Sequence, residues 1–115
     1  MNEIIKAKMI DIAKNRSFIT YQQLSDQCQL HLDMANIVQQ QQLANKLGDI
    51  STIESNAGRP LLSVVVFSQI NNQPGNGFFT LANQLGLYHG GNNPGQRDIF
   101  FINELNKCYN YWANH

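Results

Sequence analysis

The side chains able to do covalent or metal chemistry in this sequence are few and far apart. The three histidines, His31, His89 and His115, lack the spacing of metal ligands, and neither Cys28 nor Cys108 has a histidine beside it. Two such distant cysteines also form no zinc knuckle or disulfide framework, so we expect thiols in a reducing compartment. The sequence therefore predicts no catalytic residue, metal or cofactor, although an enzyme site assembled from distant residues stays an alternative.

The segment "HGGNNPGQR", residues 89–97, is the nearest approach to a ligand-binding loop. Its glycines expose backbone N–H groups, and Arg97 could meet an anion. It lacks the lysine and hydroxyl of a P-loop, so the match to a phosphate-binding loop is weak. His89 also lies in this segment, and we expect it to be a solvent-exposed loop residue. Whether the loop 88–97 binds a small ligand is left open.

The polar surface must consist of amides rather than charges. Charged residues make up 14% of the chain, against about 25% in typical domains, and the formal net charge is zero. Amides form hydrogen bonds but create no long-range field, which argues against strong nucleic-acid affinity. No apolar run reaches about 20 residues and no signal peptide is apparent, so we expect a cytoplasmic protein without a membrane segment.

Periodicity and capping signals predict several helices in one domain spanning residues 1–115. The first helix ends near Asn15. Thr20 and Gln23 match the capping box of the next helix, and a short strand precedes them. A longer helix covers 33–47.

Glycine and aspartate mark the end of that longer helix in the sequence. Gly48 is expected to end it in the left-handed conformation. Asp49 then caps a further helical turn that points Ile50 and Ile53 inward.

The C-terminal half reads as a strand followed by two helices. The β-branched run 61–67 predicts a strand buried on both faces, and 71–77 reads as a turn. A short helix starts with Phe78 in the core, and Asn93 caps a last helix that begins with proline. The expected fold is α+β, mostly helical and winged-helix-like, with a short two- or three-stranded sheet and a C-terminal helix.

Three segments resemble the DNA-binding half of alkyltransferase-like proteins. They are "ITYQQLS" at 19–25, "ANKLG" at 44–48 and "LLSVVVFSQINNQPGNGFF" at 61–79, about half of the chain. The resemblance implies a winged-helix module that binds DNA. The family's Pro-Cys-His-Arg sequence is replaced by Val-Phe-Ser-Gln at 66–69, and its helix arginine falls at Asn45. Alkyl transfer is therefore excluded, and base flipping lacks its wedge.

The preferred hypothesis is a non-catalytic module that binds DNA or RNA weakly through the helix 33–47 and the loops 71–77 and 88–97. Its affinity should be micromolar or weaker and should fall with salt. The expected phosphate contacts are Lys46, Arg59 and Arg97, and the residues expected near the groove are Tyr21, Gln22 and Asn45.

The alternative is a protein-binding module, such as a small inhibitor, an immunity or anti-defence protein, or an accessory subunit. It would use the amide-rich loops and the aromatic C-terminal helix, with Tyr109 and Trp112 at the interface. A homodimer is a further alternative. In a purely structural interpretation Arg59 pairs with Glu54.

Overall fold

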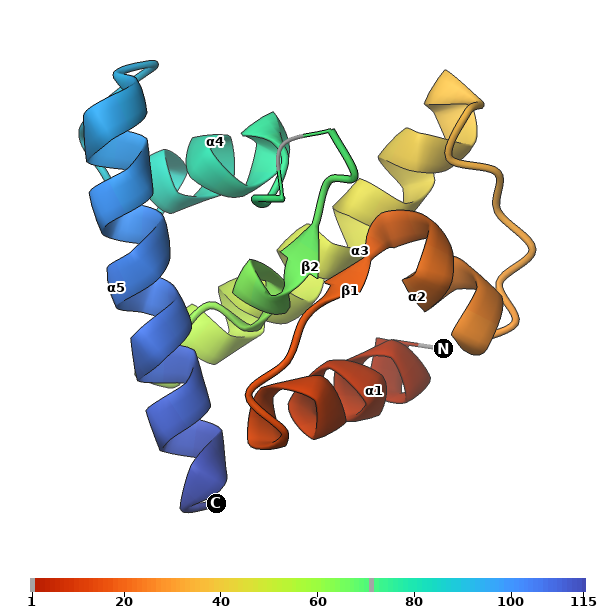
Figure 1. Cartoon of the computed structure of the whole chain (residues 1–115), viewed down its shortest axis with the longest axis horizontal. Coiled ribbons are helices and arrows are strands. Elements are labelled where there is room, and N and C mark those ends of the chain that lie inside the picture. The colour runs from red at the N-terminus through yellow and green to blue at the C-terminus, as the bar shows by residue number, and fades with distance from the viewer. Residues whose placement is uncertain (1, 71) are drawn as a thin grey trace.

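A computed structural model describes residues 2–70 and 72–115. The protein is mostly helical, at 64%, with a small sheet. Within the described ranges the elements are α1 (Asn2–Lys14), β1 (Ile19–Thr20), α2 (Tyr21–Gln27), α3 (Ile37–Asn56), the 3₁₀ helix η1 (Leu62–Val65), β2 (Val66–Phe67), α4 (Asn76–Gln84) and α5 (Pro94–Ala113) (Figure 1).

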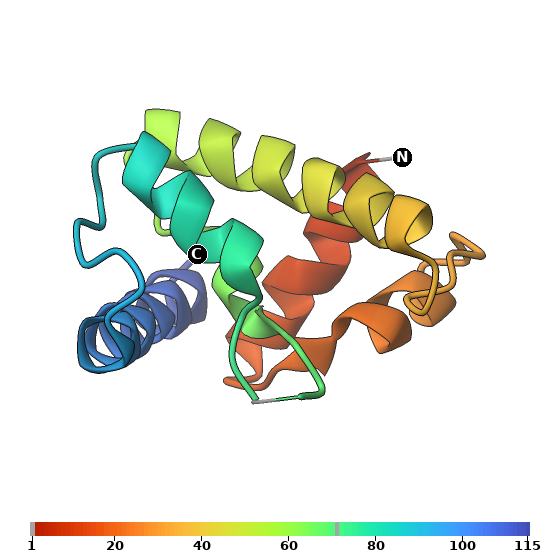
Figure 2. The ribbon, with the colours of Figure 1, turned by 90° about the horizontal axis from the view of Figure 1, so that it is seen from above.

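The segment 61–67 forms the centre of the core. Every residue in it is buried, and η1 packs against α1, α3 and α5. In the view from above, α3 runs along the upper edge of the picture, and α1 and α5 are drawn below it on either side of the central segment (Figure 2). Helices, and not the strands of a large sheet, therefore bury this apolar run.

The short strand predicted before the capping box is confirmed as β1. Within the described residues the sheet has two strands, which run parallel and pair Ile19 with Val66 and Thr20 with Phe67. Thr20 also caps α2: its Oγ1 accepts from Gln23 N at 3.2 Å, and Gln23 Oε1 accepts from Thr20 N at 3.1 Å. The predicted capping box is therefore confirmed.

The prediction that Gly48 ends a helix over 33–47 is wrong. The helix α3 starts after Asn36, whose side chain accepts from Gln39 N, and continues through Gly48 to Asn56. The buried side chains of Leu47 and Ile50 flank the glycine, and their packing offsets its poor helix propensity, which costs about 1 kcal/mol. Gly58, at φ 77°, follows the helix instead.

Residues 49–55 are helical as predicted, but they continue α3 instead of forming a separate turn, so Asp49 lies inside the helix and is not a cap. Ile50 points inward as expected, but Ile53 is exposed. The helix presents Ser51 and Glu54 to the core rather than Ile53.

The run 61–67 is buried as predicted, yet only Val66 and Phe67 form a strand. Side chains from other helices satisfy the backbone donors that a neighbouring strand would otherwise take. Leu61 N donates to Glu104 Oε2 at 2.8 Å, and Ser63 N donates to Ser51 Oγ at 3.0 Å. These contacts fix the segment as a 3₁₀ turn.

The turn predicted over 71–77 is shorter in the structure, because α4 already begins at Asn76; residue 71 lies outside the described residues. Both Phe78 and Phe79 are buried. Asn93 caps α5 as predicted, accepting from Gln96 N at 3.0 Å, with Pro94 in the first turn.

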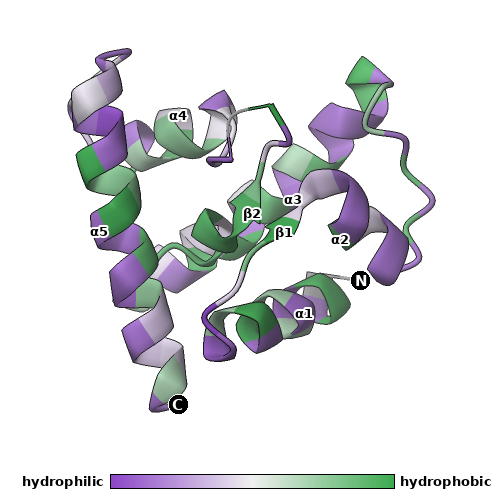
Figure 3. Cartoon of the chain, in the orientation of Figure 1, coloured by the Kyte–Doolittle hydropathy of each residue, from purple (hydrophilic) through white to green (hydrophobic). Residues whose placement is uncertain are grey.

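Hydrophobic residues also occur on the outside of the molecule. Colouring by hydropathy shows apolar segments at the start of α3, at the turn between β2 and α4, and along α5 (Figure 3). None of the helices in the described ranges combines the length and hydropathy needed to cross a bilayer.

Candidate functional site

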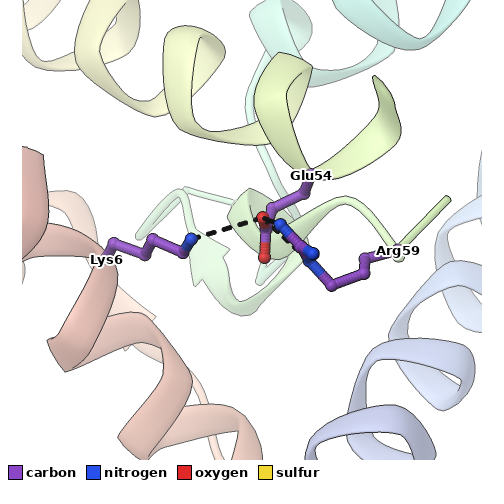
Figure 4. Close-up of polar contacts among 3 residues, drawn as sticks. All are labelled: Lys6, Glu54 and Arg59. Carbon is purple, nitrogen blue, oxygen red and sulfur yellow. Dashed lines mark hydrogen bonds and ion pairs between the residues drawn. The ribbon is translucent and has the colours of Figure 1, made fainter. Parts of the chain in front are cut away.

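A buried carboxylate lies where α1, α3 and α5 meet (Figure 4). Glu54 is fully buried, and its Oε2 accepts from Arg59 Nε at 3.0 Å and from Arg59 Nη2 at 2.5 Å. Lys6 Nζ lies 3.5 Å from the same oxygen. The expected pairing of Arg59 with Glu54 is confirmed, and Lys6 joins it from a helix distant in sequence.

This ion pair anchors the chain at the corner where α3 ends. The hydrogen bonds to Glu54 raise the pKa of Arg59, and neighbouring Tyr111 contributes a smaller effect in the same direction. Glu104 holds the next part of the chain through Leu61 N. Two buried carboxylates thus fix the entry to the central segment, which is a structural role.

The thiol beside these carboxylates is no nucleophile. Burial, followed by the charges of Glu104 and Glu54, raises the pKa of Cys108 to about 12, so the thiol stays protonated at neutral pH. Burial also raises the pKa of the partly exposed Cys28, and nearby Lys8 opposes this effect. Among the described residues no group of three or more His, Cys, Asp or Glu is placed to hold a metal ion.

Arg97 is engaged inside the loop 88–97. Its guanidinium donates to Asn76 Oδ1 at 2.8 Å, to Gly91 O at 3.1 Å and to Asn92 Oδ1 at 2.9 Å. The group also lies over the ring of Phe79, 4.6 Å from the centroid. An anion would have to compete with these contacts for Arg97.

The six residues predicted to contact nucleic acid lie in several separate places. Asn45 and Lys46 line a groove of about 490 Å3 between α3 and the preceding loop. Arg59 lies beside Tyr111, which follows Arg97 by 14 residues on α5. At 1.5 Å per residue this separation is about 21 Å along the helix, so the predicted phosphate contacts form no single cluster.

Tyr21 and Gln22 line a second groove, of about 400 Å3, which we call the Ile70 groove. It runs between the turn after β2 and the segment that leads into α3, across the start of α2. Its lining residues are Tyr21, Gln22, Asp33, Met34, Ala35, Gln40, Ser68, Gln69 and Ile70.

One exposed aliphatic side chain, that of Ile70, belongs to the lining of this groove. Ile70 is 95% exposed, and Ile37 and Val38, which follow the opposite wall in sequence, are 82% and 67% exposed. Scattered exposed aliphatic residues are common on protein surfaces. Ile70 differs from them in that it lies in the lining of a groove.

Hydrogen bonds hold both walls of the Ile70 groove. Gly75 N donates to Tyr21 Oη at 2.9 Å; burial raises the pKa of Tyr21, and this hydrogen bond opposes the shift. Ser68 N donates to Gln73 O at 2.7 Å, closing the turn that carries Ile70. On the other wall Gln22 Oε1 accepts from Met34 N at 2.9 Å. Contacts within the chain therefore hold both walls of the groove in place.

Tyr109 and Trp112 are only partly exposed. Tyr109 Oη donates to Ser17 O at 2.8 Å, and Trp112 packs against the core with a buried Nε1 for which no partner is found in the part of the chain described. The larger exposed apolar side chains of α5 are Ile99 and Ile102. The aromatic stripe thus docks α5 against the rest of the molecule.

Of the residues that line the Ile70 groove, sequence reasoning named Tyr21 and Gln22, as nucleic-acid contacts, and did not name Ile70 or Met34. The signal available for Ile70 was a single aliphatic residue within an uncharged, turn-forming stretch. No family model, curated protein or solved structure matches the chain.

Proposed function

We propose that the protein is a non-catalytic binding module whose partner is another protein, docked in the Ile70 groove. The observation that carries the proposal is the display of Ile70 on a hydrogen-bonded turn, at the edge of a groove. Among the described residues that line this groove, Asp33 is the only one with a formal charge. A rigid site loses little conformational entropy on binding, and covering exposed aliphatic groups releases water.

The charge distribution favours a protein over a nucleic acid at this groove. Phosphate recognition needs Lys or Arg, and residues 17–45 contain neither. Residues 60–96 contain no Asp, Glu, Lys or Arg at all. Arg59 and Arg97 lie outside the groove and already donate to partners within the chain.

A comparison of three tagged proteins tests the proposal. The wild type, Ile70→Asp and the matched control Ile99→Asp are used to capture partners from lysate of the source cells, with and without nuclease, and the products are identified by mass spectrometry. We expect one dominant protein that survives nuclease with the wild type and Ile99→Asp and is lost with Ile70→Asp. Capture that nuclease abolishes, or that Ile70→Asp retains, would contradict the proposal.

Weak nucleic-acid binding by a winged-helix-like arrangement of α2 and α3 is the second candidate. It is favoured by Asn45 and Lys46, which line one groove on α3. Against it, the connection 28–36 is longer than the turn of three or four residues in a helix-turn-helix, and Asp49 lines the same groove.

Titration of a DNA duplex at low and moderate salt tests this second candidate. We expect micromolar or weaker binding that weakens as salt rises, with a smaller salt dependence for Lys46→Gln. Binding that does not change with salt would reject phosphate recognition by Lys46.

A further inference from the structure

We infer that the partner segment presents an aliphatic side chain next to a lysine or arginine, with the aliphatic group against Ile70 and the cation against Asp33. This inference rests on the proposed function, because it specifies the chemistry of the partner that binds in the Ile70 groove.

Both walls of the groove carry apolar side chains. Ile70 stands on the turn after β2, while Met34 and Ala35 belong to the segment before α3. A volume of about 400 Å3 lies near the lower end of the range for ligand-binding clefts, so the site suits a few side chains of a partner. An aliphatic side chain entering it would meet carbon on both sides.

Asp33 gives the groove a negative charge. Its Oδ1 accepts from Ala35 N at 2.9 Å, and its own N–H donates to Gln39 Oε1 at 2.6 Å, so the local fold holds the carboxylate at the groove. A second carboxylate, that of Asp26, contacts a lining residue: its Oδ1 accepts from Gln22 Nε2 at 2.9 Å. With no Lys or Arg between Arg16 and Lys46 in the sequence, the local charge favours a cation.

Several of the other polar groups of the walls already have partners within the chain. Gln22 donates to Leu32 O and Asp26 and accepts from Met34 N, while Gln40 Nε2 donates to Met34 O. Tyr21 Oη accepts from Gly75 N. Because these groups are occupied, we expect recognition to use the aliphatic contacts and the Asp33 carboxylate rather than a ladder of new backbone hydrogen bonds.

Selection from a random peptide library displayed on phage tests the inference with the intact protein as bait. We expect the selected peptides to share an aliphatic residue within a few positions of a Lys or Arg. Synthetic copies should bind Asp33→Asn about two- to five-fold more weakly at low salt, which is the range of an exposed ion pair. Asp49→Asn, a matched change in the other groove, should bind as the wild type does, and Ile70→Asp should lose binding.

The outcomes separate this inference from the proposed function. Peptides that need Ile70 but share no basic residue, or that bind Asp33→Asn as tightly as the wild type, would overturn the inference and leave the proposed function standing. Peptides that still bind Ile70→Asp, or a selection that enriches nothing, would overturn both. Thermal unfolding of each variant, followed by circular dichroism, confirms that loss of binding does not reflect unfolding.

Discussion

Glu54 is the residue at which electrostatics and packing are most closely coupled. Its side chain is fully buried, whereas those of Lys6 and Arg59 retain 35% and 27% exposure. The two cations can therefore return to water if the carboxylate is removed. The carboxylate cannot do so if a cation is removed, which makes the cost of breaking the cluster asymmetric.

This asymmetry predicts different costs for removing the two cations. Arg59→Gln should lower the free energy of unfolding by about 3 kcal/mol, because it leaves a buried carboxylate with only Lys6 nearby. Lys6→Gln should cost about 0.5 kcal/mol, because it removes a single partly exposed contact. Urea denaturation of both variants measures the difference, and equal costs would contradict this account of the cluster.

The two cysteines should differ in reactivity because they differ in burial. Cys28 is partly exposed, whereas Cys108 is fully buried and its pKa is about 12. We expect the folded protein to react with one equivalent of a thiol reagent such as DTNB at pH 8, and the urea-unfolded protein with two. Cys28→Ser should abolish the reaction of the folded protein; a remaining fast thiol would show that Cys108 is accessible.

Two glycines near α3 have opposite roles at the scale of the element. Gly48 lies within the helix, where an added Cβ would make only an ordinary contact, 4.0 Å from Leu81 Cδ2. Gly58 follows the helix at φ 77°, where an added Cβ would meet no atom within 4 Å. Any effect of Gly58→Ala therefore comes from the backbone alone.

Alanine substitutions at these positions form a matched pair. Gly48→Ala should raise the free energy of unfolding by about 0.5–1 kcal/mol, because alanine is the better helix former. Gly58→Ala should lower it by about 1 kcal/mol, because an L-residue is strained in the left-handed region. Thermal and urea denaturation measure both, and destabilisation by Gly48→Ala would mean that α3 packs too tightly there for a Cβ.

At the scale of the whole molecule, stability should fall at alkaline pH. The pKa of Cys108 rises from 9.0 to about 12 on folding, and that of Tyr21 also rises. Between these limits the unfolded thiol loses its proton while the folded one keeps it, so the unfolded state gains stability as pH rises.

We therefore expect full stability below about pH 9 and a progressive loss toward pH 12, by about 1.4 kcal/mol per pH unit for one such group. Urea midpoints at half-unit intervals of pH measure the slope. Cys108→Ala should flatten the curve between pH 9 and 10, before tyrosines ionise in the unfolded chain. An unchanged slope in that variant would assign the effect to other groups.

The sequence alone determined the features that depend on neighbouring residues. The capping box at Thr20 and the cap at Asn93 involve contacts within three positions, so the local pattern was sufficient to predict them. The Arg59–Glu54 pair could also be predicted from the sequence, because the two residues are only five positions apart.

The tertiary structure decided the features whose determinants are distant in sequence. Residues 61–67 have the composition of a strand, but Glu104, 43 positions from Leu61, satisfies a backbone donor there and favours a 3₁₀ turn. Gly48 stays helical because burial of its neighbours outweighs its propensity. The Ile70 groove likewise brings together segments that are distant in sequence, and Gly75 N donates to Tyr21 Oη from 54 positions away. Hydrogen bonds and burial of this kind join residues that no local pattern connects.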